Sequence, residues 1–256
     1  MYLGVPTITG RVTKGMFQNV ITRVDNRLAG WKAKCLSLAG RVTLIKSTIT
    51  AIPAYAMQSA CLPCSICDDL DKRIRRFLWG GTTLERKPHL VNWAMVIKEK
   101  SQGGLGIRSM RQLNSAYLMK LGWRLKTEHS TLWVRLIQDK YGRGRDLDSL
   151  VGRPCSGSNA WHGIMETLEM TNRGMGVALG DGCLTEFWNH RWLDGKKLSD
   201  YALHPIPVRL SSSRVCDFWQ PDTGWKWTGS HLLPSEILQR IASFALANEE
   251  LSDQPM

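Results

Sequence analysis

The chain has 256 residues, of which 43% are hydrophobic, and it carries a formal net charge of +12. This hydrophobic fraction argues against wholesale disorder, and the length is sufficient to bury the core of one large domain or two modest ones. Lys46 interrupts the longest apolar stretch, so the sequence has no run of 18 apolar residues and predicts no membrane span.

The positive charge is concentrated in the first part of the chain. Residues 1–150 contain 25 Lys and Arg against 10 Asp and Glu, whereas residues 151–256 contain 9 against 12. Such an excess favours a polyanionic partner, because each Lys or Arg set against a phosphate releases condensed counterions. The alternative interpretation is a solvated surface that stays soluble through charge repulsion.

The cysteines and the start of the chain bear on compartment and metal binding. Met1–Pro6 has neither the basic region nor the apolar core of a signal peptide, so we expect a nuclear or cytoplasmic protein rather than a secreted one. Cys61, Cys64 and Cys67 form a Cys-x-x-Cys-x-x-Cys run that invites a zinc hypothesis. Structural zinc takes four ligands, and His89 is the only nearby fourth candidate. Packing thiols are favoured, and we predict no metal and no cofactor.

The first predicted helix follows Lys14. Apolar residues from Phe17 to Trp31 recur at the period of one helix face, while Arg23 and Arg27 lie elsewhere on the helix surface. Either this helix faces nucleic acid, or it is an ordinary amphipathic helix.

The stretch from Trp31 to Trp79 carries the clearest helical pattern. Apolar residues from Leu38 to Ile52 recur at intervals of three and four, and Ser37 stands at the N-cap position. Pro53 is expected to break or kink this helix.

A second periodic run follows from Ile66 to Leu78, with Ser65 and Asp68 at the spacing of a capping box. Its opposite face carries four cations, namely Lys72, Arg73, Arg75 and Arg76.

Three acidic residues at the start of this run raise a catalytic hypothesis. Asp68, Asp69 and Asp71 could hold metal ions for nucleotidyl transfer, but two-metal chemistry needs carboxylates that converge from separated elements. Acidic residues at a helix start complement the helix dipole, so this structural interpretation is favoured. We predict no catalytic residues.

The segments after Trp79 alternate between loops and helices. His89–Trp93 reads as a short strand or the entry to a helix, and Ser109 with Gln112 predicts a capping box. A further helix at about residues 131–141 is followed by a basic, glycine-containing segment. Its cations either complement the helix C-terminus or contact a single strand beside Tyr141, and they are Lys140, Arg143 and Arg145.

Glycines and prolines between residues 142 and 157 mark the predicted boundary between a region at 1–145 and a second at 146–256. In the second region Ser158 is expected to cap a helix. Residues 175–188 predict a β-hairpin around Gly180-Asp181-Gly182. Tryptophans between Trp188 and Trp227 favour a small aromatic core over a base-stacking surface. A last helix at 237–244 precedes an acidic end that is expected to fray.

A set of short motifs in a fixed order resembles the segment that follows the polymerase palm in plant LINE-type (non-LTR) retrotransposon reverse transcriptases. Open reading frames of that family often carry a ribonuclease H label. The motifs cover nearly the whole chain and are Tyr2-Leu3-Gly4-Val5-Pro6, Trp31, Leu36-Ser37-Leu38-Ala39-Gly40-Arg41, Ile52-Pro53-Ala54-Tyr55, Leu62-Pro63, Phe77-Leu78-Trp79-Gly80, Val91-Asn92-Trp93, Gly103-Gly104-Leu105-Gly106-Ile107, Trp123-Arg124, Leu132-Trp133, Lys140-Tyr141, Gly180-Asp181-Gly182, Phe187-Trp188 and Arg191-Trp192-Leu193.

The resemblance implies a mainly α fold, with a basic helical region like a polymerase thumb or connection, followed by a small α+β region with a Trp-rich β-hairpin. In the family the polymerase carboxylates precede the first of these motifs, and a zinc-binding segment and any ribonuclease H domain follow the last. We therefore expect a non-catalytic part of an RNA-directed DNA polymerase that binds the template and primer backbone, with its oligomeric state open. The alternatives are a degenerate transposon remnant and a protein that carries the enzyme's label without its catalytic domains. The expected nucleic-acid contacts are Lys72, Arg73, Arg75, Arg76, Arg23, Arg27, Lys140, Arg143 and Arg145.

Overall fold

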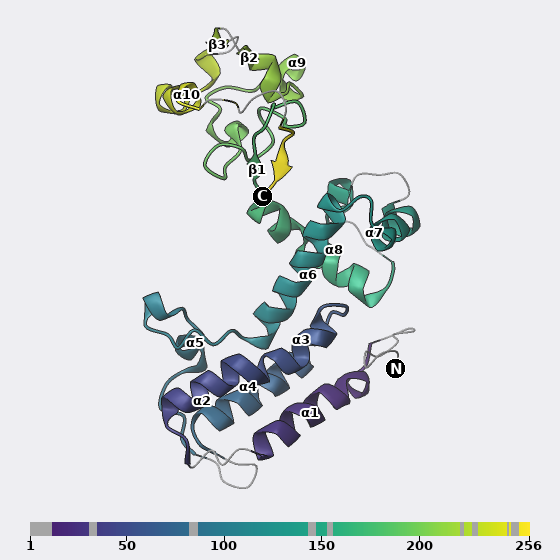
Figure 1. Cartoon of the computed structure of the whole chain (residues 1–256), viewed down its shortest axis with the longest axis vertical. Helices are drawn as coiled ribbons and strands as arrows, with labels where there is room; N and C mark the ends of the chain where they lie inside the picture. Colours follow the sequence, from purple (N-terminus) through teal and green to yellow (C-terminus); the bar gives the residue numbers. More distant parts are fainter. Residues whose placement is uncertain are drawn as a thin grey trace. The chain divides into compact units, whose positions relative to one another are not determined.

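The computed structural model describes residues 12–30, 35–81, 87–142, 147–152, 156–220, 223–226, 230–244, 246 and 251–256. The protein is mainly α-helical with a few short strands (Figure 1). It divides into two compact units, Met1–Thr171 and Asn172–Met256. Within the described ranges, no helix combines the length and the apolarity that a bilayer crossing requires.

Helices make up the first unit. Short 3-10 turns occupy Lys14–Phe17, Lys100–Gln102 and Leu147–Leu150, and π-helical turns occupy Ile45–Ile49 and Gln138–Gly142. The α-helices are α1 (Gln18–Ala29), α2 (Leu38–Leu44), α3 (Ala51–Met57), α4 (Cys64–Leu78), α5 (Trp93–Val96), α6 (Met110–Thr127), α7 (Leu132–Ile137) and α8 (Asn159–Gly174), the last of which continues into the second unit.

The main core of the first unit lies where α1, α4 and the α2–α3 segment run alongside one another (Figure 1). In α1 and α4 the helix faces that the periodicity predicted as apolar are the buried ones, whereas Leu38, the first residue of the stripe predicted from Leu38 to Ile52, is 46% exposed. Each buried side chain stabilises the fold by roughly 1.5–3 kcal/mol relative to its exposed state. The contributors from α1, from the 3-10 turn before it and from α4 are Phe17, Ile21, Val24, Ile66, Leu70, Ile74, Phe77 and Leu78.

The N-terminus of α2 matches the prediction, whereas its end does not. Ser37 caps the helix, with its Oγ accepting the N–H of Gly40 at 3.2 Å. The predicted interruption lies upstream of Pro53: the backbone widens into the π-turn, where Thr50 N–H donates to the Ile45 carbonyl at 3.1 Å. Pro53 then occupies the first turn of α3, where a missing N–H loses no helical hydrogen bond.

The start of α4 differs from the prediction. Pro63 occupies the N-cap position and makes no side-chain cap hydrogen bond, so the capping box expected from Ser65 and Asp68 is wrong. Asp68 instead faces Arg111 of α6, whose Nε lies 2.8 Å from the Asp68 carboxylate. This ion pair takes the carboxylate that the capping box would have used.

Glycines terminate α4 in a Schellman motif. The N–H of Gly81 donates to the carbonyl of Arg76 at 2.9 Å, and the N–H of Gly80 donates to the carbonyl of Phe77 at 3.0 Å. Gly80 has a φ of 71°, a left-handed conformation that other residues rarely adopt. The helix end is therefore fixed within one residue.

Two asparagine side chains, which we call the asparagine clamp, hold the segment between α3 and α4. Oδ1 of Asn114 on α6 accepts the N–H of Leu62 at 2.8 Å, and its Nδ2 donates to the carbonyl of Ala60 at 3.0 Å. Asn159 at the start of α8 makes the equivalent pair with the N–H and carbonyl of Cys61, at 2.7 and 2.9 Å. Backbone groups that no helix satisfies are thus paired with side chains.

Helix starts after α4 follow local signals. The segment His89–Trp93 leads into α5 rather than forming a strand, because Asn92 caps the helix by accepting the N–H of Ala94 at 3.0 Å. The capping box predicted for α6 is confirmed, with Ser109 Oγ accepting the N–H of Gln112 and Gln112 accepting the N–H of Ser109.

A smaller core joins α6, α7 and α8, and it changes the domain boundary. Ser158 caps α8 as predicted, and the Trp161 ring stacks on Tyr141 with centroids 4.8 Å apart. Trp161 and Leu168 of α8 pack in one cluster with Val134 of α7. The first unit consequently extends through Thr171, whereas the sequence placed its boundary between residues 145 and 146.

The second unit contains short elements and much irregular chain. Its 3-10 turns are Leu198–Tyr201, Val215–Phe218 and Ser230–Leu232. Its strands and helices are β1 (Val177–Ala178), α9 (Val208–Ser211), β2 (Trp219–Gln220), β3 (Gly224–Trp225), α10 (Ser235–Ala242) and β4 (Gln254–Pro255). β2 pairs with β3 and β1 pairs with β4, both antiparallel.

The predicted hairpin at residues 175–188 is wrong. β1 pairs with β4, so its partner comes from the end of the chain rather than from residues 183–188. The turn at Gly180–Gly182 wraps around the carboxylate of Asp253. That carboxylate accepts the N–H groups of Gly180, Gly182 and Leu184 at 2.7–3.0 Å, and the Thr185 hydroxyl at 2.7 Å.

We call this arrangement the Asp253 socket. Asp253 is only 7% exposed, and Gly180 is required beside it, because a Cβ there would collide with the carbonyl of Leu251. Residues 251–256 are therefore docked, which corrects the expectation that the acidic end frays, while residues 247–250 lie outside the described ranges.

The aromatic core predicted for the second unit is confirmed. Trp188 and Trp192 are 2% and 4% exposed, and the Phe187 and Phe218 rings lie with centroids 4.3 Å apart. The Trp192 Nε1 donates to the Phe187 carbonyl at 2.9 Å. These buried indoles have no face open for base stacking, and Trp227 lies outside the described residues.

The asparagine clamp generates a stability prediction. Asn114→Ala leaves the buried N–H of Leu62 and carbonyl of Ala60 without partners, so we expect a loss of roughly 2–4 kcal/mol in the free energy of unfolding. Denaturant unfolding monitored by circular dichroism measures it. Asn26→Ala, at an exposed position on α1, is the control and should change the value little. Equal stability of both variants would contradict the clamp.

The Asp253 socket predicts a dependence on acid. Burial alone would raise the pKa of Asp253, but Thr185 and the backbone amides outweigh it and hold the pKa below its ordinary value of 3.8. The contribution is therefore complete above about pH 4 and is lost as the pH falls through the lowered pKa. We expect Asp253→Asn to lower the free energy of unfolding by about 1–3 kcal/mol at neutral pH and to converge with wild type in acid.

Tryptophan fluorescence during urea unfolding measures this difference at each pH. Asp200→Asn, which removes an exposed carboxylate of the same unit, is the control. A difference between Asp253→Asn and wild type that stays constant on acidification would contradict the role of the charge.

Candidate nucleic-acid interface

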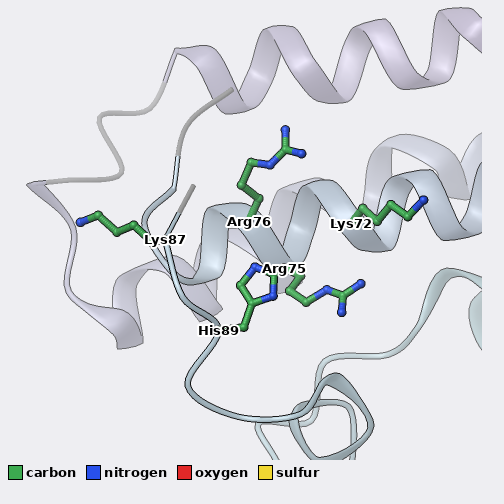
Figure 2. A pocket seen from close by; sticks show the side chains of 5 residues that line it. All are labelled: Lys72, Arg75, Arg76, Lys87 and His89. Atoms are coloured by element: carbon green, nitrogen blue, oxygen red, sulfur yellow. The ribbon is translucent and has the colours of Figure 1, made fainter. Parts of the chain in front are cut away.

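Three side chains from the basic face of α4 meet the loop after it in a hollow of about 240 Å³, which we call the cationic pocket. Figure 2 shows its side chains, with the loop crossing close to the last turns of α4. Four of its five residues are permanent cations. The lining residues are Lys72, Arg75, Arg76, Lys87 and His89.

The cationic tips are spread rather than gathered around one point. In Figure 2 the side chain of Arg76 points toward α1, while those of Arg75 and Lys72 extend along α4. Lys87 points away from α4 on the far side of the loop, and the His89 ring lies over the base of Arg75. An elongated anion with several charges matches this spread better than a single small ion.

Arg75 is held in place by an aromatic ring. Its guanidinium carbon lies 5.6 Å from the ring centroid of Trp93, within the range of a cation–π contact. Arg75 and Arg76 are both partly buried at their stems, and Lys72 is 64% exposed with its Nζ 3.7 Å from Asp69. The exposed Lys72–Asp69 pair contributes little to stability and leaves the lysine open to a stronger anion.

Arg73 does not belong to the pocket, although the sequence grouped it with its neighbours. Its Nε donates to the carboxylate of Asp25 on α1 at 2.7 Å, and its NH1 donates to the carbonyl of Asp69 at 3.1 Å. The side chain therefore ties α4 to α1. The Asp25 carboxylate neutralises the charge of Arg73, which the sequence analysis had expected to contact nucleic acid.

The end of α4 sets the position of the pocket. Arg41 of α2 donates from NH1 to the carbonyl of Leu78 at 3.0 Å, so a fixed cation covers the last turn of the helix. The Schellman motif then turns the chain, and after residues outside the described ranges it returns at Lys87 and His89. Cations near a helix C-terminus interact favourably with the helix dipole, which favours Arg75 and Arg76 in their places.

Sequence reasoning missed Lys87 and His89 as part of the site. Both are exposed and belong to a polar loop, where charged residues are expected without any function. The sequence could have indicated both residues, because they follow shortly after the glycine pair Gly80-Gly81 that ends a basic helix. Beyond His89 the loop also exposes Leu90 and Val91, at 78% and 46%, and α5 exposes Met95 at 44%.

The other predicted contacts are not part of the pocket. Arg23 and Arg27 are exposed on α1. Lys140 is exposed at the end of the π-turn after α7, with its Nζ 5.2 Å from the ring centroid of Tyr141. Arg143 and Arg145 lie outside the described residues.

The acidic residues of α4 serve helix packing. Asp71 is 7% exposed and accepts the N–H of Met110, the first residue of α6, at 3.1 Å. Asp68 pairs with Arg111, and Asp69 faces Lys72. Each carboxylate is thus directed at a different partner. None of the three lies in the first turn of α4, so the expectation that they complement the helix dipole at its start is wrong.

The cysteine run is also built into the packing. Cys67 is buried in the main core, and burial raises the pKa of its thiol to about 12. Cys61 sits in the asparagine clamp and Cys64 is exposed. Among the described residues, no three His, Cys, Asp or Glu side chains are placed to share a metal ion.

Comparisons with known proteins place the chain among plant proteins. No family model matches it. A protein of Arabidopsis thaliana named "Putative ribonuclease H protein" is 38% identical over 224 residues, which are 86% of this chain and 36% of that protein. The chain therefore spans about a third of that relative's length.

A second relative decides the family. An uncharacterized mitochondrial protein of Arabidopsis thaliana is 34% identical over 146 residues, which are 56% of this chain and 93% of that protein. The chain belongs to the family of this mitochondrial protein. This chain covers that short protein nearly whole, whereas it matches the ribonuclease H-named protein over 36% of that protein's length.

The buried carboxyl group of Asp71 predicts that the stability of the fold depends on pH. Burial, with a contribution from nearby Asp68, raises its pKa from 3.8 to about 6, although the Met110 amide partly offsets the effect. The folded state then holds a proton that the unfolded state releases, so stability falls as the pH rises from about 4 to about 6. We expect this fall to be at most about 3 kcal/mol and to be absent from Asp71→Asn.

Urea unfolding of both proteins across this pH range measures the difference. Asparagine keeps a carbonyl oxygen for the Met110 N–H, so the variant is expected to fold. Parallel curves for the two proteins would show that Asp71 does not titrate as described.

Proposed function

We propose that the chain is a non-catalytic, nucleic-acid-binding part of a transposon-derived plant protein related to LINE-type reverse transcriptases. In this proposal the cationic pocket and the neighbouring face of α4 bind the template and primer through their phosphates. The observation that carries it is the cationic pocket, where Lys72, Arg75 and Arg76 from one side of α4 meet Lys87 of the following loop, while the other side of α4 is buried.

The charge distribution supports a polyanion as the partner. The tips of these cations fan out along α4 and the loop, as Figure 2 shows, which suits phosphates that follow one another along a strand. The guanidinium of Arg75 is already held against the Trp93 ring, so little of its side-chain freedom is lost on binding.

The name of the longer Arabidopsis relative also supports a nucleic-acid partner. Its name refers to ribonuclease H, an activity on nucleic acid, and it shares 224 aligned residues with this chain. The ordered motifs of the sequence resemble the segment after the polymerase palm, which fits a role in holding a substrate for chemistry performed elsewhere. Activity of the longer protein is itself part of the proposal, because this chain spans only 36% of it.

The proposal predicts salt-dependent binding with little sequence preference. A surface that engages four phosphates loses roughly a hundredfold in affinity between about 50 and 200 mM salt. Removing two charges with the double variant Arg75→Gln and Arg76→Gln should lower the slope of log K against log salt by about 2. Fluorescence anisotropy with labelled oligonucleotides measures both quantities.

Two comparisons make the experiment specific. The double variant Lys196→Gln and Lys197→Gln removes the same charge from the second unit and should leave the slope unchanged. Arg73→Gln should lower stability through loss of the Asp25 pair while leaving the slope close to wild type. An unchanged slope for the Arg75 and Arg76 variant would overturn the assignment of the pocket. Metal-dependent nucleotide incorporation by the purified chain would overturn the non-catalytic role.

A further inference from the structure

The second unit contains a pair of cysteines that the nucleic-acid proposal does not use. Cys183 directly follows the Gly180–Gly182 turn, whose amides bind the Asp253 carboxylate, and Cys216 lies in the 3-10 turn Val215–Phe218. We infer that Cys183 and Cys216 form a redox-active thiol pair, which a small-molecule disulfide such as oxidised glutathione converts into an intramolecular disulfide.

The backbone holds the two cysteines side by side. The N–H of Cys216 donates to the carbonyl of Gly182 at 3.1 Å, and the N–H of Val215 donates to the carbonyl of Thr185 at 2.9 Å. Glu186 and Arg214 form an antiparallel bridge immediately beyond them. The two chain segments are therefore paired over several residues on both sides of the thiols.

The thiol groups themselves are in contact. The two side chains lie within hydrogen-bonding distance of each other, and both are partly exposed, so a small oxidant can reach them. A disulfide requires Cβ atoms that are already close and directed at each other, since large backbone movements are costly. The paired segments bring the two residues side by side, and the side-chain hydrogen bond between them directs the thiols at each other.

The surroundings give the two sulfurs different roles. Burial, followed by the hydrogen bond with Cys183, raises the pKa of Cys216 to about 11, so Cys216 stays protonated at neutral pH. The guanidinium of Arg214 donates to the Cys183 carbonyl at 2.7 Å, which puts a positive charge beside that residue. Because the thiolate is the nucleophile in thiol–disulfide exchange, the protonated Cys216 is assigned as the resolving sulfur and Cys183 as the attacking one.

The reaction balances as a thiol–disulfide exchange. The Cys183 thiolate attacks one sulfur of oxidised glutathione, the S–S bond breaks, and one glutathione thiolate leaves. The Cys216 sulfur then attacks Cys183, gives its proton to solvent, and expels the second glutathione as a thiolate. Two electrons pass from the protein thiols to the small-molecule disulfide, which is reduced to two thiols.

Other cysteines of the chain provide an internal contrast. Cys67 is buried, with a thiol pKa of about 12, and is therefore inert toward exchange. Burial also raises the pKa of Cys61, whereas Cys64 is exposed. Cys64→Ser is the matched control, because it removes an accessible thiol without touching the pair.

The test uses the full chain, reduced and then incubated with oxidised glutathione at neutral pH. We expect a cross-linked peptide joining Cys183 to Cys216 in a non-reducing digest, in both wild type and Cys64→Ser. Cys216→Ser should stop at one stable glutathionyl group on Cys183. Cys183→Ser should leave Cys216 unmodified over the same time.

Two results would overturn the inference. One is a wild-type chain that retains glutathione on Cys183 without forming the cross-linked peptide. The other is a Cys183→Ser variant in which Cys216 reacts as quickly as in wild type. Circular dichroism of each variant checks that the serine substitutions leave the fold intact, and none of these readouts depends on nucleic-acid binding.

Discussion

The position of α4 depends on how its two ends are fastened. Before the helix, the asparagine clamp of Asn114 and Asn159 pairs the backbone of residues 60–62 with α6 and α8. After the helix, Arg41 covers the last turn and the Schellman motif reverses the chain. With both ends fixed and one face in the main core, the remaining face has a defined orientation, and it is the basic one.

Some charged side chains of α4 bind neighbouring helices, and others remain at the protein surface. Arg73, Asp68 and Asp71 are consumed by contacts with α1 and α6, whereas Arg75 and Arg76 stay at the surface of the cationic pocket. Charge count alone cannot make this division, because it depends on which partner lies opposite each side chain. The proposed interface is accordingly narrower than the basic region from which it was inferred, and it includes a loop that the basic helix pattern did not indicate.

Sequence reasoning succeeded where the signal is local. The apolar periodicity of α1 and α4, the Ser37 cap and the Ser109–Gln112 capping box all depend on residues within a few positions of one another, and all match the structure. Sequence reasoning failed where the hydrogen-bond partner of a segment lies far away in the sequence. The Gly180-Asp181-Gly182 turn has the local chemistry of a hairpin, but Asp253, about seventy positions later, supplies a better acceptor for its amides. The ion pair of Arg73 could not be predicted for the same reason, since Asp25 lies on another helix.

The Asp253 socket also bears on the order in which the second unit is completed during synthesis. The turn around Gly180 emerges from the ribosome long before the carboxylate that its amides bind, so those amides must stay hydrated until the last residues appear. During that interval the strand β1 has no partner and presents an open edge. A ribosome that stalls shortly before Asp253 would therefore hold a nascent chain with this edge exposed to chaperones and to other unfinished chains.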